Sequence, residues 1–191
     1  MTIRAFFAIL QARLYAQRRI VFYSCAAAFI AGLFQPAGFA APLFLCSLLG
    51  IALALAQSPG LHRHLDRCEQ SAPLYGRELA RAKALVPCVA AAFAVAAFAL
   101  GEALRGSGGL PFTMLAVVAA LVPATLTALS ATIRQGVSRV LYVALAAGVA
   151  GAAYALIAVA HSLFAELGFC AVAIFLGLRQ YGEALARYDP I

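Results

Sequence analysis

The ionisable and nucleophilic side chains of this 191-residue chain include a cluster that could bind a metal, namely His62, His64 and Cys68. Histidine and cysteine are the residue types that bind zinc. On one helix, however, the two histidines would point about 200° apart, and the neighbouring arginines repel a cation. We therefore predict no metal site and no cofactor in this chain. No Ser/His/Asp set, carboxylate pair or GxGxxG fingerprint occurs, so we predict that the chain is not an enzyme.

Hydroxyl side chains follow Pro123 in an otherwise apolar stretch. Thr125, Thr127 and Ser130 are candidates for lining a polar transport pathway. Alternatively, such hydroxyls donate to carbonyls of their own helix or to a neighbouring helix. The sequence leaves both interpretations open.

Four further ionisable residues flank apolar stretches. His161 and Glu166 lie where two long apolar stretches meet, and they are candidates for an outer gate. The alternative is simple solvation at the membrane surface. Glu102 and Arg105 are similarly expected to be solvated, and the two can pair with each other.

The longest polar segment is residues 57–83. Ser71 can cap a helix whose first turn contains Pro73, a position where proline is tolerated. The pattern predicts a short amphipathic helix over residues 71–83 with basic residues mostly on one side. Either this helix binds a partner, or the segment is a solvated loop that maintains the membrane topology.

Within this segment, Glu69, Pro73, Arg77, Glu78 and Lys83 have the spacing E-x-x-x-P-x-x-x-R-E-x-x-x-x-K. The stretch resembles the cytoplasmic loop of type-2 ATP-binding cassette (ABC) exporter permeases, where it joins the second membrane span to the third. The overall layout and the short basic turn at 134–139 also resemble that family. The chain departs from the family in its shorter length, its small outer loops and the absence of pronounced re-entrant helices.

The resemblance implies a permease subunit that forms half of a translocation pathway, completed by a second permease chain as a homodimer or heterodimer. It assigns Glu69, Pro73, Arg77, Glu78 and Lys83 to coupling with a separate ATPase subunit. The chain itself lacks the G-x-x-x-x-G-K-[ST] phosphate loop, so ATP and Mg would bind the partner chain. An alternative function is a structural or assembly subunit of a larger membrane complex. A facilitator is disfavoured by the lack of a mid-membrane charge.

The composition predicts that membrane helices position these residues. Hydrophobic residues make up 65% of the chain and charged residues only 11%, compared with about 25% charged in soluble domains. The net charge is +7, and the basic residues lie between the apolar stretches. These positions indicate that the basic residues set the membrane topology and contact a lipid bilayer, not nucleic acid.

A membrane-spanning helix needs roughly 20 apolar residues. Six stretches are candidates, and they form one transmembrane domain over residues 20–178, followed by a tail at 179–191. The predicted spans are residues 20–34, 42–56, 84–100, 111–133, 140–160 and 163–178.

The positive charges test this layout. With six spans, only Arg105 of the fourteen Lys and Arg residues falls on the outer face. Positive residues concentrate on the cytoplasmic side of membrane proteins. We therefore predict a multi-pass protein of the inner (plasma) membrane with both termini in the cytoplasm.

Residues 1–19 have a different pattern, with apolar residues at helical spacing. The apolar positions are Ile3, Phe6, Phe7, Leu10 and Leu14, and polar residues at most other positions include Arg4, Gln11, Arg13, Gln17 and Arg18. This predicts an amphipathic helix in the cytoplasmic membrane interface, although a water-exposed lead-in to the first span is the alternative. The predicted fold is therefore an all-α integral membrane protein with six transmembrane helices preceded by an interfacial helix.

Overall fold

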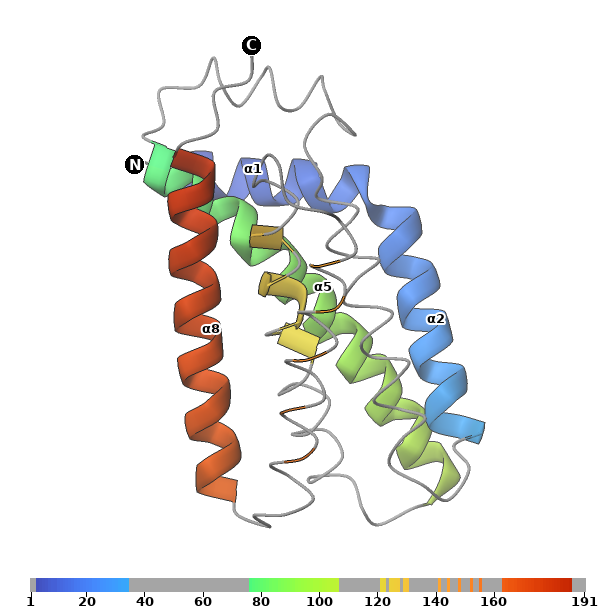
Figure 1. The fold of residues 1–191 in the computed structure, drawn as a ribbon. Helices are drawn as coiled ribbons and strands as arrows, with labels where there is room; N and C mark the ends of the chain where they lie inside the picture. The colour runs from blue at the N-terminus through green and yellow to red at the C-terminus, as the bar shows by residue number, and fades with distance from the viewer. Residues whose placement is uncertain are drawn as a thin grey trace.

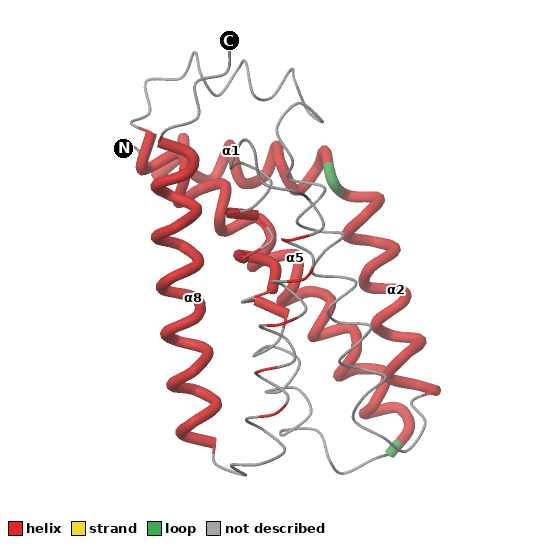
Figure 2. Tube along the Cα trace, viewed as in Figure 1, coloured by secondary structure: helices red, strands yellow, loops and turns green. Residues whose placement is uncertain are grey.

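The structure is a computed structural model that describes a defined part of the chain. The described residues are 3–34, 76–106, 121–122, 124–127, 129–130 and 163–186, with the single positions 141, 144, 148, 152 and 155. They form helices and include no strand (Figure 2). The all-α class predicted from the sequence is confirmed for these residues. The main helices are α1 (Ile3–Ala16), α2 (Arg18–Phe34), α5 (Gly76–Arg105) and α8 (Leu163–Ala186).

Helix α1 lies across one end of the bundle, whereas α2, α5 and α8 extend away from that end (Figure 1). Only Gln17 separates α1 from α2. The Gln17 amide donates to the Arg13 carbonyl at 3.1 Å, and the Val21 amide donates to the Gln17 carbonyl at 3.0 Å. The change of direction is therefore tight and hydrogen-bonded. We call residues 15–23 the elbow.

Helices α2 and α5 run in the same direction and approach each other through small residues (Figure 1). Gly32 and Gly101 lie opposite each other where the helices are closest. A Cβ atom on Gly32 would lie 2.4 Å from the Phe98 carbonyl oxygen, and one on Gly101 would lie 2.5 Å from the Phe29 carbonyl oxygen. Ala28 packs with Phe98 in the same contact. The two backbones therefore touch, a packing mode that small residues permit.

Helix α5 packs against α8 through larger side chains. Tyr181 of α8 belongs to a buried cluster with Ala84 of α5 and with Leu126 and Leu129. Gly177 of α8 also faces the Leu126 side chain, since a Cβ there would lie 2.7 Å from the Leu126 Cβ. Side-chain interdigitation therefore holds this half of the bundle together.

Helix α5 is longer than the element predicted at its position. The sequence predicts a short helix over 71–83 and a separate span over 84–100, but one continuous helix covers Gly76–Arg105. No helix-breaking residue lies between Gly76 and Lys83, and backbone hydrogen bonding does not depend on the change from polar to apolar side chains. Pro87 lies inside α5, where it removes one backbone donor. Residues 71–75 lie outside the described part.

The other helices can be compared with the predicted spans. Helix α2 includes all of the predicted span 20–34, and α8 begins where the span 163–178 was predicted to begin. Described positions within 111–133 and 140–160 are also helical, whereas 42–56 lies outside the described residues. Among the described residues, one stretch, Ala82–Arg105, is long and apolar enough to cross a membrane. The count of six spans stays a prediction.

Apolar side chains lie both inside the described bundle and on its surface. Buried positions include the polar residues Ser24 and Thr125 and many alanines. Several large apolar side chains also face outward: Phe34 is 76% exposed, Phe22 68% and Phe175 65%.

Candidate functional site

The residues assigned to coupling fall partly within α5. Arg77 and Glu78 lie in its first turn, and Lys83 is half-buried further along the same helix. Glu69 and Pro73 lie outside the described residues. The beginning of the motif's helix is therefore continuous with the apolar stretch Ala82–Arg105.

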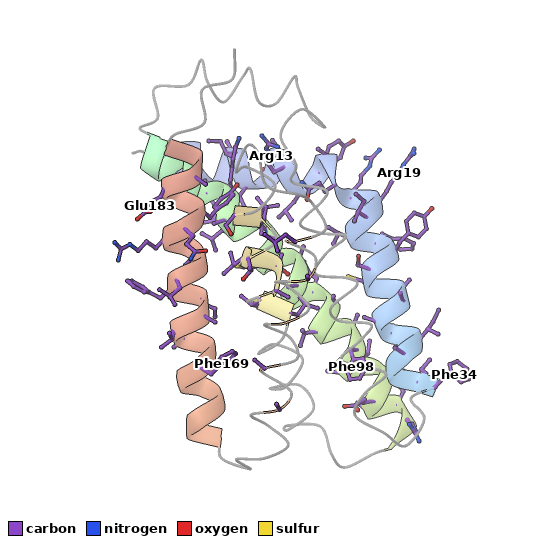
Figure 3. All side chains as sticks on the ribbon, viewed as in Figure 1. Arg13, Arg19, Phe34, Phe98, Phe169 and Glu183 are labelled. Carbon is purple, nitrogen blue, oxygen red and sulfur yellow. The ribbon has the colours of Figure 1, made fainter. Side chains whose placement is uncertain are left out.

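Helix α1 lies across this same end of the bundle and contacts α5 (Figure 3). Two polar side chains near its end are buried in the bundle. Arg13 is 2% exposed and Gln17 1% exposed, although both were expected on the polar face. Phe7, assigned to the apolar stripe, is 59% exposed.

The physical reason is visible on a helical wheel. At about 100° per residue, Phe6, Leu10, Arg13 and Gln17 fall on one face of α1, and the first two are half-buried. The amphipathic pattern identifies two faces but not which one meets protein. A buried guanidinium requires polar partners, and Arg13 and Gln17 both have interaction partners. The four-residue spacing of the two polar side chains is the signal that was available.

The outer side of the elbow carries basic and aromatic residues. Arg18, Arg19, Phe22 and Tyr23 line an open hollow of about 320 Å³. The Arg18 guanidinium carbon lies 4.3 Å from the centroid of the Tyr15 ring, a cation–π geometry. The Phe22 and Tyr23 rings lie 5.9 Å apart in an edge arrangement. From the sequence, the two arginines are expected to set the topology, and Phe22 and Tyr23 to belong to the first span. The surface that the four residues share depends on the fold.

Two of the three candidate pathway hydroxyls are turned toward their own helix. Thr125 is 1% exposed, and its Oγ1 donates to the Leu121 carbonyl. Ser130 is 4% exposed, and its Oγ donates to the Thr127 carbonyl at 2.8 Å. Each of these two hydroxyls thus uses its single donor within the helix. Thr127 is half-buried.

The candidate outer residues are only partly described. Glu166 lies in the first turn of α8, whereas His161 lies outside the described residues. Glu102 was expected to be solvated but is 5% exposed. It is buried because its backbone lies directly against Gly32, where α2 covers the end of α5. Arg105 is exposed, in line with the expectation.

No group of three or more potential metal ligands occurs among the residues that the structure describes. His62, His64 and Cys68 lie outside them.

An exposed ion pair joins Arg179 and Glu183 on α8, with Nε and Oε1 3.1 Å apart.

No family model, curated protein or solved structure matches the chain.

Proposed function

We propose that the chain is an integral membrane protein with six spans and cytoplasmic termini. The exposed aromatic side chains support this proposal, because lipid accepts outward-facing Phe22, Phe34 and Phe175 without the cost that water imposes. The small-residue contact at Gly32 and Gly101 also supports it, since helices in lipid associate by close backbone packing. Helix α1 at the end of the bundle suits the cytoplasmic interface.

Within the membrane, the function is that of a permease subunit of an ATP-driven exporter, coupled to a separate ATPase and paired with a second permease chain. The observation that carries this proposal is the continuity of α5. Arg77 and Glu78, from the motif that resembles a coupling segment, lie on the same helix as the apolar stretch Ala82–Arg105. A partner that binds at 71–83 and moves during ATP hydrolysis would displace the beginning of α5, and the continuous helix would carry movement past Pro87 into the apolar stretch.

The proposal is tested by purifying the tagged chain from its native membrane in mild detergent. We expect an ATPase chain with a phosphate-binding loop to co-purify, and we expect ATP hydrolysis by that complex. The variants Arg77→Ala and Glu78→Ala should lower ATPase recovery by at least about tenfold, the loss expected from removing a charged docking contact. The control Arg179→Ala, at an exposed α8 position whose ion pair is with Glu183 of the same helix, should not. A chain that purifies without any ATPase contradicts the exporter role.

The alternative is a structural or assembly subunit without transport activity. The hydroxyls of Thr125 and Ser130 favour this alternative. Both donate their hydrogen bonds to carbonyls of their own helix, so neither is available to donate to a transported solute. Co-purification of a stable membrane complex that lacks an ATPase would support this alternative.

A further inference from the structure

We propose that the elbow binds the phosphate headgroup of an anionic phospholipid in the cytoplasmic leaflet. The site is the hollow lined by Arg18, Arg19, Phe22 and Tyr23. This proposal rests on the membrane embedding proposed above but not on the exporter role. It assigns to the two arginines a specific ligand, in addition to their contribution to topology.

The geometry of α2 places both arginines on one side of the helix, one turn before the two aromatic residues. Arg18 and Phe22 are four residues apart, as are Arg19 and Tyr23, and side chains at this spacing are neighbours on a helix surface. All four side chains are exposed. Figure 3 shows Arg19 extending outward from the beginning of α2. Two arginines that line a common hollow are suited to a phosphate, to which arginine donates paired hydrogen bonds.

The aromatic residues identify the source of that phosphate as a lipid. Phe22 and Tyr23 are each 68% exposed and lie one helical turn further along α2 than the arginines. Their rings can contact the glycerol and upper acyl chain of a lipid whose headgroup is held by the arginines, as aromatic residues do at membrane interfaces. A free phosphate ion would gain nothing from this apolar surface.

The arrangement of α1 adds to the site. Tyr15 lies beneath the Arg18 guanidinium, with 4.3 Å between its ring centroid and the guanidinium carbon. This contact restricts the arginine rotamer and lowers the entropy lost when it binds an anion. The opposite face of α2 packs on α5 through Ala28 and Gly32. The helix that carries the site is therefore held in place.

The test uses the absence of tryptophan from the chain. A Phe22→Trp variant in nanodiscs supplies a single fluorescent reporter within the hollow. Quenching is measured with phosphatidylglycerol and with phosphatidylcholine, each brominated on its acyl chains. We expect phosphatidylglycerol to be preferred at least about fivefold, the factor that one basic residue contributes near an anionic surface. Adding Arg18→Gln and Arg19→Gln should reduce the preference to near one, whereas Arg179→Gln should not change it.

Native mass spectrometry of the chain without the reporter provides a second measurement. Phosphatidylglycerol should remain bound on release from mixed-lipid nanodiscs, and the double glutamine variant should lose it. Equal quenching by both lipids, or an unchanged preference in the double variant, overturns the site but leaves the membrane embedding intact. Loss of the preference on adding inorganic phosphate at matched ionic strength identifies a free ion as the ligand and also overturns it. Absence of quenching by either lipid overturns the embedding as well.

Discussion

The two sides of α5 are packed in different ways. Toward α2, the backbones touch at Gly32 and Gly101, and no side chain separates them. Toward α8 and residues 121–130, Leu126, Leu129 and Tyr181 fill the space. A contact between backbones cannot adjust by changing rotamers, whereas a contact between side chains can repack. The first contact therefore fixes the geometry of α5, and the second buries large side chains that can repack.

The largest expected effect comes from adding a side chain at the backbone contact. Gly32→Leu places carbon atoms where the Phe98 carbonyl lies. We expect destabilisation beyond the roughly 1–3 kcal/mol that is usual for overpacking, because a backbone atom cannot rotate away. Circular dichroism during SDS titration in mixed micelles measures the loss. Gly168→Leu is the matched control, since its Cβ meets nothing within 4 Å. Equal stability of the two variants would contradict the close contact.

An intermediate effect is expected at the side-chain contact. Tyr181→Ala removes a ring that is 2% exposed, and we expect a loss of roughly 2–3 kcal/mol from the cavity that remains. The control Phe175→Ala, on the same helix at a 65% exposed position, should cost much less. The same SDS titration distinguishes them. If the control is as costly as Tyr181→Ala, then α8 packs through its other face.

The smallest effect is expected within the segment that packs between α5 and α8. Thr125→Val removes a hydroxyl that donates to its own helix, so no other element loses a partner. We expect a stability change within about 1 kcal/mol. Transport by the reconstituted complex, if it is an exporter, should not change. A strong transport defect with normal stability would show that Thr125 contacts the solute and that this region opens during transport.

The sequence predicts which stretches are helical more reliably than it predicts which face of each helix packs against the rest of the protein. The apolar stretch that ends at Phe34 and the one that begins at Leu163 correspond to ends of α2 and α8. Hydropathy could not reveal that α5 extends back to Gly76, because polar residues continue a helix as readily as apolar ones. The four-residue spacing of Ser24, Ala28 and Gly32, all buried, is a readable signal of the close contact.

The candidate site was less predictable, because burial of a polar residue depends on its neighbours. Arg13 and Gln17 are inside because α1 lies across the bundle, and Glu102 is inside because α2 covers it. Neither arrangement is encoded in a single periodic pattern. The spacing of Arg18, Arg19, Phe22 and Tyr23 was visible in the sequence, but the hollow that unites them depends on the elbow.

The glycine contact also constrains how the chain can evolve. At most packed positions, enlargement of one residue is compensated by reduction of its neighbour, and the two positions covary. Gly32 and Gly101 each face main-chain atoms of the other helix, and the main chain has no smaller alternative. We therefore expect each glycine to be retained independently in related sequences, so that a statistical search for covarying pairs would miss the tightest contact in the described bundle.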